Sequence, residues 1–359
     1  MNVQLCDRFE WLSLIGRSKY ALPDHLWAER NIHLKFFKRG GGFIAFNFNR
    51  KVSLGLRLIL SFGLRRSGGF FVDNLSNLNK INYVIRSFRS AFDLFNFTFK
   101  LHYNVNLASA IVKAINKYSN IYFSVLHARV LELKGGYNYI WRRKFNKKAR
   151  NLARKFRKLG GAVRSVCNPI KLIDDIMECN LSNPFRQGRY LPQSYLDRAL
   201  VIKGLKSRFY NERFHHFIGA FLDDKLVGYS YLSILNGYGY ISRFLVHENY
   251  KGYGVSEGLM ASIIKFLCDH GVEKVQYGYW DPKSAPGVDH FLKQHGFEDG
   301  PELAVFIPFT TKGFSMLRSR MFLDNVYHNV PFRDGFKKIM STLFKNKYHI
   351  FLNSLLFRS

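Results

Sequence analysis

The chain has 359 residues, 47% of them hydrophobic, which is enough for two domains of ordinary size with buried cores. Lys and Arg number 55 against 25 Asp and Glu, so the formal net charge is +30. This composition excludes a disordered chain, and the charge indicates an anionic partner such as nucleic acid, anionic lipid or acidic glycan. A generally basic protein without such a partner is the alternative.

Signals for export and for disulfide bonding are missing from the sequence. The N-terminal residues lack the basic leader and the apolar block of a secretory signal. The longest apolar stretch, residues 52–64, has only 13 residues and includes Arg57, so it predicts a buried strand pair or helix and no transmembrane segment. No CxxC pair occurs, so we expect neither a disulfide framework nor a structural zinc site, which fits a reducing cytoplasm. The four cysteines are Cys6, Cys167, Cys179 and Cys268.

The first third of the chain is rich in aromatic and β-branched residues and predicts a mixed α and β region. Glycine clusters at 39–42 and 65–69 are typical of turns between strands. Helical spacing of apolar residues runs over 107–118, and strand-like alternation runs over 121–133.

A dense basic segment follows, from Trp141 to Lys158. Apolar residues at helical spacing predict an amphipathic helix here, closed by Gly160-Gly161. Like charges one turn apart repel one another, so the basic face either binds an anion, such as tRNA or a membrane surface, or is simply solvated. The segment has no acid and ten cations, namely Arg142, Arg143, Lys144, Lys147, Lys148, Arg150, Arg154, Lys155, Arg157 and Lys158.

The second half of the chain has a regular order of elements. Asn168-Pro169 and Leu191-Pro192 each predict a helix start with proline at the first helical position. Asn236-Gly237, between alternating apolar runs, is a strong hairpin signal and predicts an antiparallel meander. The predicted strands are 214–222, 226–235 and 238–246, followed by a helix over 255–267 that ends at Gly271, a strand at 272–279, a helix at 287–295 and a strand at 303–308.

The most specific motif joins the third strand of the meander to the next helix. It reads Val246-His247-Glu248-Asn249-Tyr250-Lys251-Gly252-Tyr253-Gly254-Val255. Two glycines spaced by one residue allow a sharp turn, so that several backbone N–H groups and the positive end of a helix dipole converge. This arrangement predicts a site for a diphosphate group.

The order of elements over about residues 165–310 resembles the GNAT acyltransferase superfamily, and the glycine loop resembles its pyrophosphate-binding signature for coenzyme A. Gly252 and Gly254 match that signature, Tyr250 and Lys251 fit its flanks, and Asn249 stands where the family has Arg or Gln. The resemblance implies an α+β fold with a mixed, mostly antiparallel sheet flanked by helices. It also implies acetyl-coenzyme A or another acyl-coenzyme A as co-substrate.

Residues 135–163 resemble the FemABX-like branch, whose chains carry two GNAT-fold halves. This resemblance implies a degenerate GNAT-like half at 1–135, an acyltransferase domain at 136–310 and a basic, aromatic extension at 311–359. The extension either lies on an anionic membrane or packs as helices against the two halves.

Acyl transfer from a thioester needs few obligatory side chains, because positioning and oxyanion stabilisation supply much of the rate. The resemblance implies that backbone N–H groups of Phe244, Leu245 and Val246 hold the carbonyl, beside the loop from Asn249 to Val255. It also places Leu292 where many members carry a tyrosine general acid, so that acid is missing here.

Three residues are candidates for the base or proton donor: Tyr240, Glu248 and Asp281. Each has a plainer structural role open to it, namely aromatic packing, helix capping or solvent exposure, and turn formation. His215 and His216, adjacent in a strand, point to opposite faces and cannot share a metal, so we expect none.

Three functions remain open from the sequence. The first is an N-acyltransferase that moves an acyl group, acetyl in the simplest case, from acyl-coenzyme A to a small-molecule, glycan or peptide amine. The second is a FemABX-like aminoacyl transferase that uses aminoacyl-tRNA, and the third is a non-catalytic binding protein at an anionic surface. We expect a cytoplasmic protein, either free or peripheral at the inner membrane surface.

Overall fold

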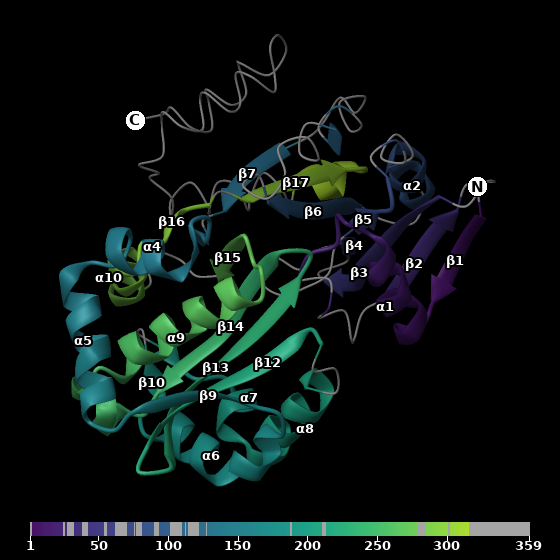
Figure 1. Cartoon of the computed structure of the whole chain (residues 1–359). Helices are drawn as coiled ribbons and strands as arrows, with labels where there is room; N and C mark the ends of the chain where they lie inside the picture. The colour runs from purple at the N-terminus through teal and green to yellow at the C-terminus, as the bar shows by residue number, and fades with distance from the viewer. Residues whose placement is uncertain are drawn as a thin grey trace. The chain divides into compact units, whose positions relative to one another are not determined.

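The chain forms two compact units in the computed structural model (Figure 1). Residues 1–20, 25–125 and 302–359 make up the first unit, and residues 21–24 and 126–301 make up the second. The predicted turns at 39–41 and 65–69, most of the predicted helix at 107–118 and the extension beyond 315 lie outside the described residues. The structure describes residues 2–23, 26, 32–37, 42–53, 56–61, 70–74, 76, 81–89, 93–100, 110, 111, 113, 122–126, 128–186, 189–209, 213–278, 285–300 and 302–315.

The first unit contains an eight-stranded sheet with the order β1-β2-β3-β4-β6-β17-β7, in which β5 also pairs with β3. Asp7 caps helix α1 by accepting a hydrogen bond from the Glu10 N–H at 2.8 Å, and Trp11 of that helix is buried against Phe71. The apolar stretch at 52–64 contributes to a strand pair, β3 and β4. The elements are β1 (Asn2–Cys6), α1 (Arg8–Arg17), β2 (Ile32–Phe37), β3 (Phe43–Ser53), β4 (Leu56–Ser61), β5 (Phe70–Val72), α2 (Ile81–Phe88), β6 (Leu94–Lys100), β7 (Tyr122–Leu126) and β17 (Glu302–Pro308).

The second unit contains a seven-stranded sheet with the order β16-β8-β15-β14-β13-β12-β9. Only β14 and β15 run parallel; the other neighbours are antiparallel. The mixed, mostly antiparallel sheet expected from the sequence is therefore confirmed. The strands are β8 (Arg129–Glu132), β9 (Ala162–Val166), β12 (His215–Leu222), β13 (Lys225–Leu235), β14 (Tyr238–Val246), β15 (Lys274–Tyr277) and β16 (Glu298–Asp299), with a separate hairpin of β10 (Phe185–Arg186) and β11 (Arg189–Tyr190).

Helices cover both faces of this sheet (Figure 1), and α9 lies on the opposite face from α6 and α8. Alternate residues of the strands feed the two cores: Ile218 and Ile241 pack on the α9 face, whereas Phe217 and Tyr231 pack on the α6 face. The helical elements are α4 (Gly136–Arg143), α5 (Lys147–Lys158), η3 (Pro169–Leu172), α6 (Ile173–Leu181), α7 (Gln193–Leu196), α8 (Arg198–Arg208), η4 (Glu248–Tyr253), α9 (Val255–Asp269) and α10 (Pro286–Gln294).

The predicted meander is confirmed as β12, β13 and β14. Its two turns have positive φ at both central residues, 47° and 59° at Asp223 and Asp224, and 50° and 72° at Asn236 and Gly237. Asn, Asp and Gly tolerate this left-handed backbone best, and turns of this kind match the twist of the strands they join. The turn chemistry in the sequence therefore sets the register of the meander.

Three elements differ from their sequence-based predictions. The basic segment forms two helices, because the Asn146 side chain accepts the Ala149 N–H at 2.8 Å and starts α5 anew. Pro192 precedes α7 instead of occupying its first position, and the longer α8 begins after Asp197.

The third difference concerns sheet pairing. The strand-like run predicted over 121–133 forms two strands in different sheets, because β7 pairs with β17 of the first unit and β8 pairs with β15 and β16 of the second unit. The strand at 303–308, β17, also pairs with β6 of the first unit. The expected domain limits at 135 and 310 stay predictions. However, β8 precedes residue 135 and belongs to the sheet of the second unit, and β17 precedes residue 310 and belongs to the sheet of the first unit.

Candidate functional site

The glycine loop forms a short 3₁₀ turn followed directly by a long helix. Residues Glu248–Tyr253 make up η4, and Gly254, at φ 79°, leads into α9. The first bond of α9 runs from the Gly258 N–H to the Gly254 carbonyl, at 2.9 Å. The N–H groups of residues 255–257 therefore have no carbonyl acceptor within the helix, and they lie at the positive end of the helix dipole. This end of α9 is suited to an anion.

One acid also lies at this end of α9. Burial raises the pKa of Glu257, while its own backbone N–H and Lys148 oppose the rise.

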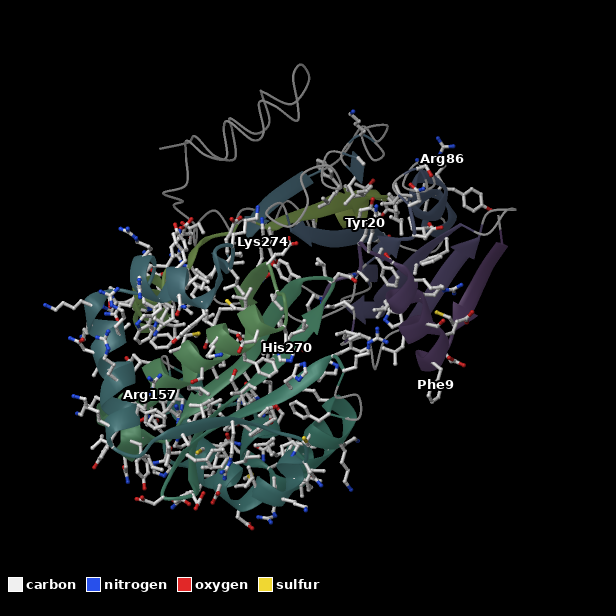
Figure 2. All side chains as sticks on the ribbon, in the orientation of Figure 1. Phe9, Tyr20, Arg86, Arg157, His270 and Lys274 are labelled. Carbon is white, nitrogen blue, oxygen red and sulfur yellow. The ribbon has the colours of Figure 1, made fainter. Side chains whose placement is uncertain are left out.

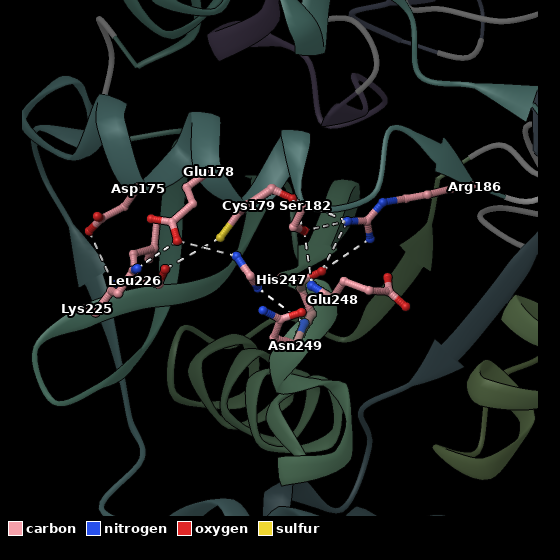
Figure 3. Close-up of polar contacts among 11 residues, drawn as sticks. Asp175, Glu178, Cys179, Ser182, Arg186, Lys225, Leu226, His247, Glu248 and Asn249 are labelled. Carbon is pink, nitrogen blue, oxygen red and sulfur yellow. Dashed lines mark hydrogen bonds and ion pairs between the residues drawn. The ribbon is translucent and has the colours of Figure 1, made fainter.

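The end of α6 anchors the loop from one side (Figure 3). Arg186 donates to the carbonyls of Asn183, at 2.8 Å, and Val246, at 3.2 Å. The Ser182 hydroxyl accepts the Glu248 N–H at 3.0 Å. Burial lowers the pKa of Arg186, and Glu248 opposes this shift. The guanidinium therefore fixes the last residue of β14, and the Ser182 hydroxyl fixes the first residue of the loop turn.

Helix α5 contacts the loop from another side. Lys155 Nζ donates to the Gly252 carbonyl at 2.8 Å. A Cβ atom at Gly254 would lie 2.8 Å from the carbonyl carbon of Leu152 and closer still to its oxygen. Phe156 packs in the same way against Gly258, whose Cβ would lie 3.0 Å from the ring Cγ. The glycines thus allow the basic helix to approach the loop backbone closely.

Cations on the outer surface of α5 come close to the loop through this packing. Arg157 lies on that surface (Figure 2), and Lys155 is exposed as well. The other exposed cations of α4 and α5 are Arg142, Arg143, Lys147, Lys148, Arg154 and Lys158.

The two parallel strands beside the loop separate before β14 ends. Their pairing stops at Ile241 and Tyr277, and the last bond runs from the Gly278 N–H to the Ile241 carbonyl at 2.7 Å. A register shift opposite Tyr231 and Leu232 places Ser242 as the extra residue of a bulge in β14. Such bulges bend a strand and redirect its backbone groups. Residues 242–246 consequently have no paired strand on the β15 side within the described residues.

The direction of the backbone groups in this segment follows from strand alternation. The His247 N–H bonds the Val227 carbonyl of β13 at 2.9 Å, so Leu245 also faces β13, whereas Phe244 and Val246 face away from it. The Val246 carbonyl is already held by Arg186. Of the three expected strand residues, Phe244 and Val246 therefore have N–H groups that face the β15 side, and Phe244 is the one whose carbonyl is not held by Arg186.

The structure locates two of the three catalytic candidates. Tyr240 is partly buried on β14, and its hydroxyl would lie 3.7 Å from a Cβ at Gly278. Glu248 bonds Lys251 at 2.7 Å and Asn183 at 2.9 Å, and these two bonds lower its pKa. A carboxylate held in this way is a weaker base than a free one. Asp281 lies outside the described residues.

Leu292 is fully buried in the core on the α9 face, so position 292 supplies no proton donor. His215 bonds the Ser233 hydroxyl at 2.9 Å, whereas His216 contacts Phe266 of α9, which places the two imidazoles on opposite faces. Among the residues that the structure describes, no group of three or more His, Cys, Asp or Glu side chains could hold a metal ion.

Residues 178–297 match the family model described as the acetyltransferase (GNAT) family. These residues form a domain of the GNAT superfamily. The match begins in α6 and ends after α10, so it includes the loop, the bulged β14 and the start of α9. The resemblance identified from the glycine loop and the meander is therefore confirmed.

Solved structures resemble the chain in fold over both units. FemX superposes with a TM-score of 0.60 at 11% identity, covering 85% of this chain and 97% of that one. A conserved protein of unknown function from Bacteroides thetaiotaomicron gives 0.57 at 8% identity, covering 86% and 99%. L-PGS from Bacillus licheniformis gives 0.56 at 9% identity, covering 88% and 96%. No curated protein sequence matches the chain.

Sequence reasoning missed the side chains that hold the GNAT loop in place. Arg186 and Ser182 lie about sixty residues before the loop and belong to no recognisable motif. Their role depends on the packing of α6 beside β14, which the pattern of apolar residues does not specify. Asn146, in contrast, precedes an apolar, helical repeat and could have been identified as a helix cap.

Proposed function

We propose that the chain is an N-acyltransferase that moves an acyl group, acetyl in the simplest case, from acyl-coenzyme A to an amine acceptor. The observation that supports it is the opening between β14 and β15, where the Phe244 N–H faces outward next to the N-terminal end of α9. A thioester lying along this opening would place its carbonyl near the Phe244 N–H and its diphosphate at the loop from Asn249 to Val255.

The reaction forms a C–N bond and breaks a C–S bond. The amine nitrogen attacks the thioester carbonyl carbon, the oxygen carries the developing negative charge, and the sulfur leaves as a thiolate. The nitrogen then loses a proton and the thiolate gains one. Tyr240, Glu248 and Asp281 remain our candidates for handling these protons, and water is the alternative donor because Leu292 cannot serve.

Calorimetry with acetyl-coenzyme A tests the donor site. Gly252→Glu introduces a negative charge at a position where a Cβ meets no atom within 4 Å, so the fold should tolerate it while binding is lost. Gly204→Glu makes the same charge change on α8, also in open space, and serves as the matched control. If the protein does not bind acetyl-coenzyme A, or if Gly252→Glu binds it unchanged, the donor assignment is wrong.

A second donor, aminoacyl-tRNA, is supported by the exposed cations of α5 beside the loop. A tRNA that neutralises six or more of its phosphates on such a surface would lose roughly a thousandfold in affinity between 50 and 200 mM salt. Replacing Arg154, Arg157 and Lys158 with Gln should flatten this dependence. A shallow salt dependence in the unchanged protein would leave acyl-coenzyme A as the donor.

We propose a location in the cytoplasm, based on the scattered cysteines without a CxxC pair, and the net charge supports binding at the anionic inner membrane surface. No helix in the described part of the chain has both the length and the apolar character needed to cross a bilayer. Sedimentation with vesicles of anionic lipid, compared with neutral lipid, would distinguish the two locations.

A further inference from the structure

Arg243 of β14 is enclosed by aromatic rings. Its Cζ atom lies 3.5 Å from the ring centroid of Tyr195 and 4.7 Å from that of Tyr231. Its Nη1 atom donates to the Tyr231 hydroxyl at 3.3 Å, and the side chain is partly buried. Among the described residues, no Asp or Glu forms an ion pair with Arg243.

The other enclosed arginines of this unit have partners that explain their burial. Arg129 pairs with Asp289 and Asp299, and Arg186 donates to backbone carbonyls at the loop. Withdrawing a guanidinium from water is costly unless its N–H groups and charge are matched. The phenols can accept from only some of the five N–H donors of Arg243, and no Arg243 nitrogen is both fully buried and without a partner, so the remaining donors are accessible to an anion from outside the chain.

A second guanidinium lies at the same tyrosine. Arg208, the last residue of α8, has its Cζ atom 4.8 Å from the ring centroid of Tyr231 and donates to the Ser242 hydroxyl at 3.5 Å. Ser242 and Arg243 form the bulge of β14. Both cations therefore contact the Tyr231 ring beside the bend of the strand.

This cluster adjoins the proposed reaction centre on the other face of the sheet. Arg243 directly precedes Phe244, whose ring packs against Phe291 of α10 at 5.6 Å between centroids. Tyr231 belongs instead to the core on the α6 face. A donor held at the loop and an acceptor bound beside Arg243 would thus meet at the Phe244 N–H from different faces of the sheet.

Resting on the proposed acyl transfer, we propose that the acceptor carries an anionic group, a carboxylate or a phosphate, in addition to its amine, and that Arg243 and Arg208 bind this group. The planar guanidinium of arginine presents paired N–H donors that fit both kinds of oxyanion. Stacking between Tyr195 and Tyr231 fixes the plane of Arg243 before the acceptor arrives.

The test compares amines that differ only in the anionic group. One pair is β-alanine with its carboxamide, and the other is phosphoethanolamine with ethanolamine. Release of the coenzyme A thiol from acetyl-coenzyme A reports transfer, and calorimetry of the intact protein with each amine reports binding without catalysis. The two pairs distinguish a carboxylate from a phosphate.

Variants then assign the effect to Arg243. Arg243→Met should raise the KM for the preferred anionic amine about 10- to 100-fold, the cost of a lost charge-assisted hydrogen bond, with the KM for acetyl-coenzyme A unchanged. Arg243→Lys keeps the charge without the planar donors, so its KM for the anionic amine should lie between those of the unchanged protein and Arg243→Met. The matched control is Arg164→Met, since Arg164 stacks on Phe221 at 4.0 Å but pairs with Asp224 at 3.6 Å. Far-ultraviolet circular dichroism and thermal unfolding check that each variant folds.

The outcomes separate this inference from the donor assignment. A preference for one anionic amine that Arg243→Met abolishes and Arg164→Met retains supports it. Equal use of charged and neutral amines overturns it. The inference is also overturned if the protein binds acetyl-coenzyme A but neither acetylates nor binds either of the anionic amines. If acetyl-coenzyme A does not bind but an anionic amine binds through Arg243, the donor is wrong and the anion site stands.

Discussion

Replacing Gly254 with alanine is the sharpest test of how the loop is built. The residue has φ 79°, a left-handed backbone that costs an L-residue roughly 1–2 kcal/mol. Its new Cβ would also lie 2.8 Å from the Leu152 carbonyl carbon, well inside ordinary contact distance. Helix α5 must then move away from the loop, and overpacking of this kind typically costs about 1–3 kcal/mol. We expect a total loss of about 3 kcal/mol.

Gly252→Ala provides the matched control two residues earlier. A Cβ at Gly252 meets nothing within 4 Å, and Gly252 is not among the residues with positive φ. Its cost should stay within about 0.5 kcal/mol, as for surface substitutions in general. The pair therefore separates the geometry at Gly254 from a general effect of removing glycine.

Hydrogen–deuterium exchange is the suitable assay, because a chain of two units need not unfold in one step. A loss of 3 kcal/mol in local stability corresponds to about a hundredfold faster exchange in peptides from α5 and α9. Peptides from α8 should change little. If the two alanine variants exchange alike, the close contact between α5 and the loop does not exist as described.

Three further predictions concern the second unit. Burial lowers the pKa of His295 to about 4, below its ordinary 6.5. Between these pH values the unfolded chain binds a proton that the folded chain excludes, so the free energy of unfolding is highest above pH 6.5 and falls as the pH drops toward 4. Burial lowers the pKa of His216 to about 4 as well, so urea unfolding of His295→Gln should lose about 2 kcal/mol less between pH 7 and pH 5 than the unchanged protein loses; an equal loss in the two proteins would contradict this. Arg129→Met leaves Asp289 without its buried partner and should cost about 3 kcal/mol, read from the urea midpoint, and a cost below 1 kcal/mol would refute it. Asn146→Ala removes the cap on Ala149 and should cost about 1 kcal/mol, seen as faster exchange at the start of α5 but not of α9.

Local chemistry explains which parts of the fold could be predicted from the sequence. The meander and its turns follow from alternation and from residues that tolerate positive φ, such as Asn236 and Gly237. The loop follows from Gly252 and Gly254 standing between a strand and an amphipathic helix. These signals lie within a few residues of one another, so tertiary packing does not override them.

The parts that could not be predicted depend on contacts between distant segments. Nothing in the alternation of β17 says that its partner is β6, roughly two hundred residues earlier, because apolar alternation is the same whichever sheet a strand joins. The anchoring of Val246 by Arg186 likewise depends on how α6 packs. The aromatic setting of Arg243 requires residues from α7 and β13 as well as from β14.

The order in which the strands enter their sheets has a consequence for synthesis on the ribosome. The sheet of the first unit places β17 between β6 and β7, so its inner strand is the last one to be translated. The second sheet needs no strand later than β16, at residues 298 and 299. The sheet of the first unit is therefore complete only after β17 has been translated. The second unit can complete its sheet earlier, although most of its residues are translated after those of the first unit.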